Sequence, residues 1–481
     1  MAKMIINGES VDSVTGQTYE VRNPANGDVV DTAPKGNEAD ARAAIDAADA
    51  AFDAWSHTSA EDRAKLLFKS AELVNSHRKE LAEILTREQG KPLQEADTEI
   101  EHFLHGLEFY AGLASKVRGA QVPLPAKNAY GMVIRKPLGV CGAIVPWNFP
   151  ITLMGTKVGP ALAAGNTVVV KPASTTPLCS IRIIDLMNQA GVPKGVLNIV
   201  TGPGSVVGEE LLKNPKIRRI AFTGESGTGK HIAEVACGDF KRVTLELGGS
   251  DPMIVCDDAD VQKAITGAMV GRFWNAGQAC LAVKRLYVFE KLFDQLVEGL
   301  SSKVARYEVG DGMTKADKPK IRMGPLHTAD QRAEIEAQVE DAVKRGARIA
   351  LGGSRPEGSQ YEKGFYYNPT ILVDVPDDAR AVTEETFGPV LPIFKVSSLD
   401  EAIDRANKSI YGLGSSIWTK NIDTIDTAVD RLQAGNVWVN SLHYGYDELP
   451  FGGIKASGFG REHGPEALDY YLEPKGVVIT R

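Results

Sequence analysis

The chain has 481 residues, 43% of them hydrophobic and 24% charged, and 54 Lys and Arg against 62 Asp and Glu give a formal net charge of −8. This length predicts two or three domains, and the mildly acidic balance without a basic block disfavours nucleic acid and anionic membranes as partners. No apolar run reaches membrane-spanning length, and the first residues turn polar too soon for a signal peptide, so we expect a cytoplasmic protein.

The first third of the chain reads as short strands and then helices. Helical spacing and stop signals predict short strands and turns over 1–35 and helices near 38–54, 60–89 and 93–115. Ser59 and Asp62 are expected to cap the second helix. Three prolines in residues 119–137 predict a strand pair that leaves the body of the domain.

From residue 139 onward strand-like and helical segments alternate, which is typical of a parallel, doubly wound sheet. The expected strands are 139–145, 167–171, 196–200, 219–223 and 243–247. A second α/β series follows residue 250, with expected strands at 253–256, 285–289, 348–351, 391–396, 413–419 and 436–440. Ligands bind such sheets at the carboxyl ends of the strands. The apolar tail 476–481 predicts one more strand that needs a partner.

Five cysteines are scattered along the chain without a Cys-x-x-Cys pair, so we expect neither disulfides nor a metal site. Cys141, Cys179, Cys237 and Cys256 are expected to be buried small hydrophobic residues. Cys280 differs because it closes the small-residue turn 275–280, where the thiol can be approached. A thiol nucleophile needs a base, and a carboxylate such as Glu246 can supply one or can activate a water.

Other segments offer binding groups whose role the residues alone leave open. The glycine-rich turns 201–208 and 222–229 each follow a strand and open a helix. Each of the two turns can bind a phosphate through its backbone or can be an ordinary turn between a strand and a helix. The second turn approaches a P-loop pattern, but His231 stands where Ser or Thr would bind magnesium. Lys171 ends a strand, and Asn148 is held between two aromatic residues and two prolines, where its amide can stabilise an oxyanion or close its own turn.

Together these motifs resemble the NAD(P)-dependent aldehyde dehydrogenase superfamily, nearest its succinate-semialdehyde and short-chain branch. The motifs occur in order as Pro-Trp-Asn-Phe-Pro (146–150), Lys-Pro (171–172), Phe-Thr-Gly (222–224), Leu-Glu-Leu-Gly-Gly (245–249), Gly-Gln-x-Cys (277–280), Glu-Glu-Thr-Phe-Gly-Pro (384–389) and Pro-Phe-Gly-Gly-x-Lys-x-Ser-Gly (450–458). The resemblance implies an α/β fold with a Rossmann-type cofactor domain, an α/β catalytic domain and a β oligomerisation arm.

The resemblance also implies where these domains lie. Residues 1–118 and 138–248 would form the cofactor-binding domain, 249–448 the catalytic domain, 119–137 and 464–481 the arm, and 449–463 a return segment to the cofactor domain. The arm implies a homodimer or a homotetramer.

The implied reaction is the non-acylating oxidation of an aldehyde to a carboxylate. Cys280 would attack the aldehyde to give a thiohemiacetal, with the Asn148 amide and the Cys280 N–H as oxyanion hole. After hydride loss to the nicotinamide, Glu246 would activate the water that hydrolyses the thioester. A CoA-acylating dehydrogenase is the enzymatic alternative, but such enzymes typically lack the glutamate base. A non-catalytic binding or structural protein on the same fold is the other alternative.

The resemblance carries cofactor contacts onto residues of six segments. They are Val145, Pro146, Trp147, Lys171, Ser174, Gly204, Gly208, Phe222, Thr223, Gly224, Glu225, Leu247, Glu385 and Phe387. Two residues depart from the pattern. NAD-preferring members usually carry Glu where Ser174 stands, and a serine would not repel a 2′-phosphate, so we expect NADP to be accepted besides NAD. Glu225 stands where Ser is usual and partly opposes that inference.

For the substrate, we expect a small aldehyde such as succinate semialdehyde, lactaldehyde or an aminoaldehyde. Members that bind a carboxylate often place Arg where Trp274 stands, six residues before the cysteine. An aromatic residue there favours an apolar or amino-bearing aldehyde, and Arg272 is nearby with an unknown direction. Trp274, Tyr446 and Phe451 are the expected substrate residues.

Overall fold

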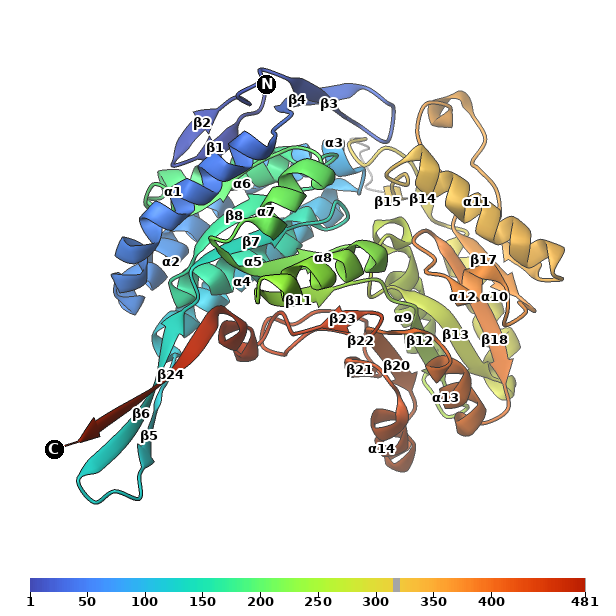
Figure 1. Ribbon diagram of the computed structural model, residues 1–481. Coiled ribbons are helices and arrows are strands. Elements are labelled where there is room, and N and C mark those ends of the chain that lie inside the picture. Colours follow the sequence, from blue (N-terminus) through green and yellow to red (C-terminus); the bar gives the residue numbers. More distant parts are fainter. Residues whose placement is uncertain (315–320, 481) are drawn as a thin grey trace.

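The computed structural model describes residues 1–314 and 321–480, so Arg481, the end of the predicted last strand, lies outside the described residues. Two α/β bodies lie side by side, and a narrow arm of strands projects from the first (Figure 1). In these described residues no helix is both long and apolar enough to cross a membrane.

The first body contains an eight-stranded sheet in the order β2-β1-β9-β8-β7-β10-β11-β23. Its strands are β1 (Met4–Ile6), β2 (Glu9–Val11), β7 (Val140–Ile144), β8 (Thr167–Lys171), β9 (Leu197–Ile199), β10 (Ile217–Thr223), β11 (Arg242–Glu246) and β23 (Gly458–Phe459). The five central strands, which are β9, β8, β7, β10 and β11 in sheet order, run parallel. The predicted parallel sheet is therefore confirmed.

Helices cover both faces of this sheet (Figure 1). One face carries α1 (Glu38–His57), α7 (Glu209–Lys213) and α8 (Ser226–Gly238), and the other carries α2 (Ala60–Ser76), α3 (Arg78–Gln89), α4 (Leu93–Leu113), α5 (Pro150–Ala164) and α6 (Leu178–Gln189). Alternate strand side chains enter opposite cores, because successive residues of a strand point to opposite faces. Val169 packs in the core with α1, whereas Val168 and Val170 pack in the core with α2 to α6.

Two local predictions in this body need correction. The predicted helix 60–89 is two helices, because His77 turns the chain with φ −107° and ψ 8° while its Nδ1 lies 3.0 Å from the Leu73 carbonyl. Cys237 is exposed on α8 and is not a buried residue. The predicted cap is confirmed, since the Ser59 hydroxyl accepts the Asp62 N–H at 3.1 Å.

The second body contains a seven-stranded sheet in the order β16-β17-β18-β13-β12-β20-β21. Its strands are β12 (Asp251–Val255), β13 (Val283–Phe289), β16 (Arg348–Leu351), β17 (Thr370–Val373), β18 (Val390–Val396), β20 (Gly414–Trp418) and β21 (Asn436–Val439). Its helices are α9 (Val261–Phe273), α10 (Glu290–Val304), α11 (Ala329–Lys344), α12 (Arg380–Thr383), α13 (Leu399–Asn407) and α14 (Ile422–Arg431). The short strand β17 was not predicted.

Short strand pairs complete the two bodies. They are β3 (Thr18–Arg22) with β4 (Val29–Pro34), β14 (Glu308–Val309) with β15 (Ile321–Met323), and β19 (Tyr411–Gly412) with β22 (Ile454–Lys455).

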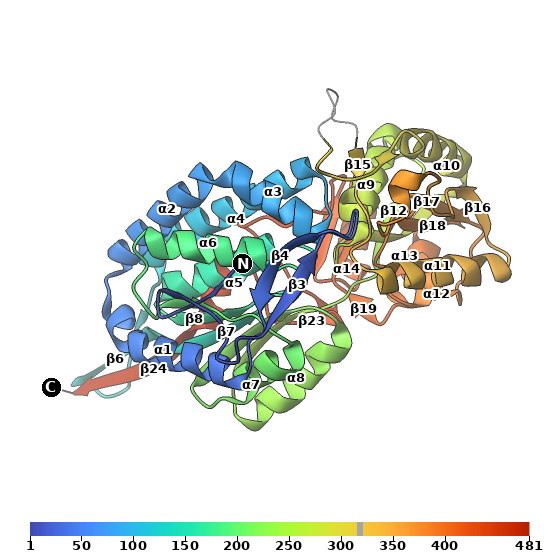
Figure 2. The same ribbon diagram turned by 90° about the horizontal axis from the view of Figure 1, so that it is seen from above.

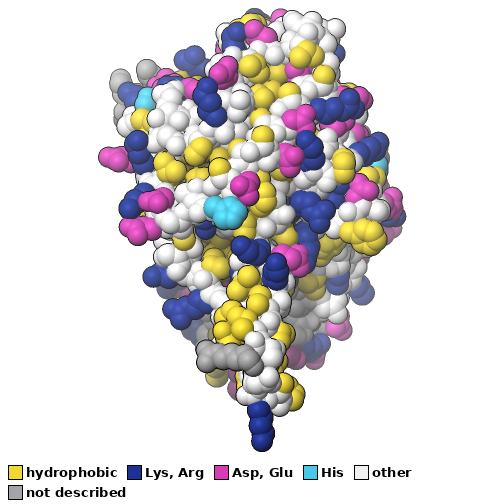
Figure 3. Space-filling model, turned by 60° about the vertical axis from the view of Figure 1, so that its left-hand side comes forward, with side chains coloured by type: hydrophobic (Ala, Val, Ile, Leu, Met, Phe, Trp, Pro, Cys, Tyr) yellow, Lys and Arg dark blue, Asp and Glu magenta, His cyan; other side chains and the backbone are white. Residues whose placement is uncertain are grey.

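The arm consists of β5 (Ala120–Pro123), β6 (Ala129–Pro137) and β24 (Leu472–Thr480). It projects away from both bodies (Figure 2). The tail strand finds the partner it was predicted to need, because β24 pairs antiparallel with the whole length of β6. Hydrophobic side chains gather along the arm (Figure 3), and Val122 and Val478 on it are exposed.

After the second sheet the chain returns to the first. Strand β23 pairs antiparallel with β11, with Gly458 opposite Glu246. The Leu247 N–H donates to the Ser457 carbonyl at 3.1 Å, and the Ser457 hydroxyl donates to the Gly248 carbonyl at 2.7 Å. The return segment therefore closes over the motif that carries Glu246.

Candidate active site

The predicted cofactor residues of the first sheet share one edge. Ile144 pairs with Lys171 on one side and with Phe222 on the other, and Thr223 pairs with Glu246. Because parallel strands end at the same edge, the turns after them come together there. The residues concerned are Val145, Pro146 and Trp147 after β7, Lys171 and Ser174 at β8, Gly204 and Gly208 after β9, Phe222, Thr223, Gly224 and Glu225 at β10, and Leu247 after β11.

Asn148 lies against the turn that carries Cys280. Its side-chain Nδ2 donates to the Gln278 carbonyl at 3.0 Å. Its own backbone carbonyl accepts from Lys91 Nζ at 2.8 Å and from Asn275 Nδ2 at 3.0 Å. An amide nitrogen carries two hydrogens, so the Asn148 side chain keeps one for a further acceptor.

The turn before Cys280 has an unusual backbone. Asn275, Ala276 and Gly277 have φ values of 49°, 54° and 74°. Residues other than glycine rarely occupy this left-handed region, and such strain gathers at functional sites. A Cβ on Gly277 would lie 2.3 Å from the Gly388 carbonyl, so only glycine fits there. Gln278 braces the turn by donating to the Asn275 carbonyl at 2.9 Å.

Cys280 and the Leu-Glu-Leu-Gly-Gly motif are in contact although they lie far apart in the sequence. A Cβ on Gly249 would lie 2.7 Å from the Cys280 carbonyl. Burial raises the pKa of the Cys280 thiol to about 12, against the opposing charge of Lys284. The thiol is therefore protonated in this state, and a base has to take its proton before it can act as a nucleophile.

Glu246 occupies an unusual pocket for a carboxyl group. It is 3% exposed, and neither of its oxygens has a hydrogen-bond partner among the described residues. Burial raises its pKa well above the ordinary range, the charge of Glu462 raises it further, and Lys157 and Arg461 oppose the shift. A Cβ on Gly452 would lie 2.6 Å from Glu246 Oε1, so the carboxyl faces the return segment.

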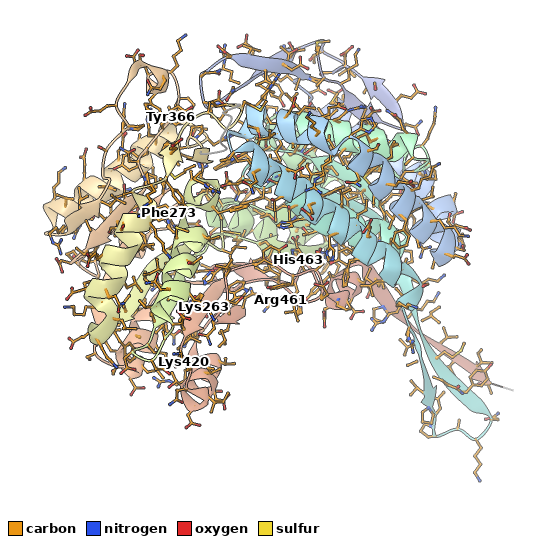
Figure 4. The ribbon with its side chains drawn as sticks, turned by 180° about the vertical axis from the view of Figure 1, so that it is seen from behind. Lys263, Phe273, Tyr366, Lys420, Arg461 and His463 are labelled. Atoms are coloured by element: carbon orange, nitrogen blue, oxygen red, sulfur yellow. The ribbon has the colours of Figure 1, made fainter. Side chains whose placement is uncertain are left out.

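Glu462 and Lys157 form a buried ion pair beside that pocket. Lys157 Nζ lies 2.8 Å from Glu462 Oε1 and donates to the Thr223 hydroxyl at 2.7 Å, and the Thr156 hydroxyl donates to Glu462 Oε2 at 2.6 Å. Figure 4 shows Arg461 and His463 on the same return segment, between the helices of the first body and the second body.

Glu385 and Phe387 reach the site from the second body. Glu385 Oε1 accepts the Gly249 N–H at 2.9 Å and Lys284 Nζ at 2.8 Å. A Cβ on Gly248 would lie 2.3 Å from Glu385 Oε2, so the carboxylate rests on the bare glycine backbone. Phe387 meets the Trp147 ring edge-on at 5.7 Å between centroids.

Several groups at this edge suit a dinucleotide. Helix α8 begins after Gly224 and Glu225, and none of the described side chains caps its first N–H groups, so they remain for an anion. Lys171 is buried, its Nζ donates to the Pro172 carbonyl at 2.8 Å, and burial lowers its pKa to about 8. The Ser174 hydroxyl donates to the Gly202 carbonyl at 3.0 Å. The residues present therefore fit a bound dinucleotide.

The three predicted substrate residues lie in different surroundings. Phe451 is buried in a small cluster with Leu413 and Trp438, against which Cys280 packs. Trp274 is 36% exposed and lines a cavity of about 660 Å³ between the start of α4 and helices α9 and α10. Tyr446 is 44% exposed and meets Tyr444 edge-on. The structure thus places Phe451 in the cluster against which Cys280 packs, and Trp274 and Tyr446 nearer the surface.

Arg272 does not point toward a substrate. It is fully buried and donates to the carbonyls of Val283, Thr386 and Gly388. Its guanidinium is committed to the backbone of the loop that carries Glu385 and Phe387.

Sequence reasoning missed Lys284, Lys157 and Glu462. Lys284 follows Cys280 by four residues, a spacing that could have drawn attention to it. For Glu462 no local signal exists, since its partner Thr156 is 306 residues away in the chain.

Comparison with known proteins agrees with this geometry. The profile of the aldehyde dehydrogenase family matches residues 11–477. Betaine aldehyde dehydrogenase of Bacillus subtilis (strain 168) is 41% identical over 476 residues, covering 98% of this chain and 96% of that protein. Succinate-semialdehyde dehydrogenase [NADP(+)] of Escherichia coli (strain K12) is 40% identical over 475 residues, covering 99% and 97%.

Solved structures give the same result. The NAD+ complex of an aldehyde dehydrogenase from Bacillus cereus superposes with a TM-score of 0.96 at 40% identity, covering 100% of this chain and 96% of that one. The predicted family and fold class are thereby confirmed, and the chain belongs to the aldehyde dehydrogenase family.

Proposed function

We propose that this enzyme oxidises a small aldehyde to its carboxylate with NADP or NAD, using Cys280 as nucleophile. The observation that carries the proposal is the meeting of three groups at one edge of the first sheet. The Asn148 amide lies at the Cys280 turn, and Glu246 ends β11, buried and without a hydrogen-bond partner among the described residues. Related enzymes carry names that include betaine aldehyde, succinate semialdehyde and NADP(+).

Each residue has one step. The Cys280 thiol gives its proton to solvent water and its sulfur attacks the aldehyde carbon, while the second N–H of the Asn148 amide and the Cys280 N–H hold the oxygen that becomes negative. A bound nicotinamide would supply the acceptor for the hydride of that carbon, and Cys280 would then carry a thioester. Glu246 then takes a proton from water, and the hydroxide displaces the Cys280 thiolate to release the carboxylate.

For the cofactor, we propose that Lys171, Ser174 and the start of α8 hold the adenosine side, with Glu385 and Phe387 at the nicotinamide side. Ser174 carries no charge, so a 2′-phosphate meets no repulsion there. Replacing Ser174 with Glu is expected to lower the selectivity for NADP over NAD by about tenfold, the effect of one unfavourable charge pair near the surface. Steady-state kinetics with both cofactors measure this, and an unchanged ratio would refute the role of Ser174.

For the substrate, we propose a small aldehyde without a strict need for a carboxylate. Arg272 is committed to backbone carbonyls and cannot also bind a substrate anion. The aromatic side chains of Phe451, Tyr446 and Trp274 suit an apolar or amino-bearing chain. A panel containing succinate semialdehyde, lactaldehyde and an aminoaldehyde tests this, and a strong preference for succinate semialdehyde would contradict it.

We also propose the domain division and assembly that the family resemblance implies. Residues 1–118 and 138–248 would bind the cofactor, and 249–448 would carry the nucleophile. Residues 449–463 would lead the chain back to the cofactor domain, and 119–137 with 464–481 would form the arm. The exposed Val122 and Val478 support assembly through the arm into a homodimer or homotetramer. Light scattering on the wild type and on Val478→Lys tests this, with monomers expected for the variant if the arm holds the subunits together.

The central test is replacement of the nucleophile. Cys280→Ala is expected to lower NAD(P)H production by at least about 10⁴-fold, because the proposed covalent intermediate forms on the Cys280 sulfur. Cys237→Ala, an exposed cysteine on α8, is the matched control and should retain activity. Substantial turnover by a folded Cys280→Ala protein would overturn the assignment.

A further inference from the structure

His327 lies just before α11 in the second body, yet its ring is buried against the first. It is 5% exposed, with Nδ1 3.1 Å from the Gln89 carbonyl and Nε2 2.7 Å from the Thr175 hydroxyl. A carbonyl can only accept, so Nδ1 carries the hydrogen and Nε2 accepts from Thr175. Burial lowers the pKa of His327 to about 4, which keeps this neutral form over the ordinary pH range.

The same residue also contacts a neighbour of each component of the proposed oxyanion site. Its ring stacks on Trp147 at 4.5 Å between centroids and 6° between planes, and Trp147 directly precedes Asn148. Its backbone N–H donates to Gln278 Oε1 at 2.8 Å, while the Gln278 carbonyl accepts from Asn148 Nδ2. His327 thus contacts Thr175, Trp147 and Gln278. These residues lie next to Ser174, next to Asn148 and in the turn before Cys280, respectively.

The backbone that presents His327 is tightly fixed. A Cβ on Gly324 would lie 2.1 Å from the Gly90 carbonyl, and one on Gly90 would lie 3.0 Å from the Pro325 ring. Lys91, which follows Gly90, donates to the Asn148 carbonyl through its Nζ. Neither the ring nor its support can shift without moving the segment that holds Asn148, since packed interiors transmit displacement.

We propose that His327 is a positioning residue that ties the cofactor loop around Ser174 to the oxyanion donor Asn148. This inference rests on the proposed roles of those two residues. The Thr175 hydrogen bond holds the loop in the conformation that receives the adenosine side of the cofactor. The stack on Trp147 holds the Asn148 amide in line with Cys280. The two contacts use different atoms of one ring, so they can be removed separately.

Thr175 and Thr176 give a matched pair for the first contact. Thr175 is exposed apart from its bond to His327, whereas the Thr176 hydroxyl is buried without a partner among the described residues. Thr175→Val should weaken NADP binding about fivefold, the effect of one hydrogen bond, and Thr176→Val should change it less than twofold. Isothermal titration with NADP, without aldehyde, measures this independently of turnover.

Two substitutions of His327 separate the contacts. His327→Phe keeps a ring on Trp147 and loses the acceptor, so NADP binding should weaken about fivefold while kcat per active site stays within twofold. His327→Gln keeps an acceptor for Thr175 and loses the stack, so NADP binding should stay within twofold while kcat falls several-fold. Active sites are counted from the pre-steady-state burst of NADPH. In the double variant Thr175→Val with His327→Phe, the losses in NADP affinity should not add.

The inference is overturned if Thr175→Val and Thr176→Val behave alike. It is also overturned if both His327 variants lower only the Tm, with kcat per site and NADP affinity unchanged, because that is the result of a purely structural role. A wild type that binds NADP but oxidises no aldehyde would instead refute the proposed function, and the NADP titrations would still decide the role of the Thr175 contact.

Discussion

The two sides of the proposed active site are built in opposite ways. On one side the side-chain amide and the backbone carbonyl of Asn148 are paired, since the amide donates to Gln278 and the carbonyl accepts from Lys91 and Asn275. On the Glu246 side both carboxyl oxygens lack a hydrogen bond within the described residues. A donor for a developing oxyanion works best when it is fixed beforehand.

A general base has a different requirement. An unpaired buried carboxyl is costly, and such groups in native structures usually have a functional reason. Because no hydrogen bond holds either oxygen, we expect Glu246 to accept a proton from the water that attacks the thioester. The contrast predicts that substitutions on the two sides affect different steps.

Glu246→Gln is expected to have the largest effect after removal of the nucleophile. The amide cannot take a proton from water, so thioester hydrolysis should slow by about 10³-fold, toward the upper end of general-base contributions. The first turnover does not need this step, so the NADPH burst should persist. Stopped-flow absorbance separates the two phases, and a burst that disappears together with the steady state would assign Glu246 to thiol activation instead.

Asn148→Ala is expected to act on the earlier step. Removing one fixed oxyanion donor should lower the burst rate by about 10²-fold. The same stopped-flow measurement gives the rate constant of the burst. If the burst stays fast and only the later phase slows, the amide does not stabilise the oxyanion.

Glu462→Gln should shift a pH profile by a smaller amount. The charge of Glu462 raises the pKa of Glu246, and a base works only when deprotonated, so activity rises with pH through that pKa. Removing the charge lowers the pKa of Glu246 and moves the acid limb of the kcat profile to lower pH. The exposed Glu466→Gln serves as control and should leave the limb in place, and an unmoved limb in Glu462→Gln would contradict the coupling.

Glu95→Gln should change stability more than activity. Burial raises the pKa of Glu95 to about 8, with its Oε2 accepting the Asn275 N–H at 2.8 Å. The folded state therefore holds a proton that the unfolded chain releases near pH 4.3, and stability falls as pH rises between the two values, by at most about 1.4 kcal/mol per pH unit.

The glutamine variant cannot ionise, so its urea unfolding free energy should fall less between pH 5 and pH 8 than that of the wild type. The exposed Glu72→Gln should match the wild type. Equal slopes for wild type and Glu95→Gln would show that Glu95 is already ionised at pH 5.

The sequence predicted the parts of the fold that local patterns determine. The five parallel strands of the first sheet and the cap at Ser59 follow from periodicity and from the residue types at element ends. The strand Thr370–Val373 was missed because four residues carry too little periodicity. The break at His77 was missed because no glycine or proline marks it.

Within the site, the motifs that bind through backbone turns were predictable, whereas the long-range contacts were not. Glu462, Lys157 and His327 have no signal of their own. Lys157 and Glu462 meet only when the return segment packs on the first body. His327 acquires its partners only when the two bodies pack together. The direction of Arg272 could not be read from its position, because it depends on the carbonyls of Thr386 and Gly388, more than a hundred residues away.

The most direct test of the separate roles of Cys280 and Glu246 is mass spectrometry of Glu246→Gln, as intact protein and as peptides, after mixing with NADP and an aldehyde. We predict a mass increase of one acyl group on the peptide that contains Cys280, and none in Cys280→Ala. An acyl adduct on another residue, or no adduct while Glu246→Gln still produces NADPH in a burst, would contradict the account.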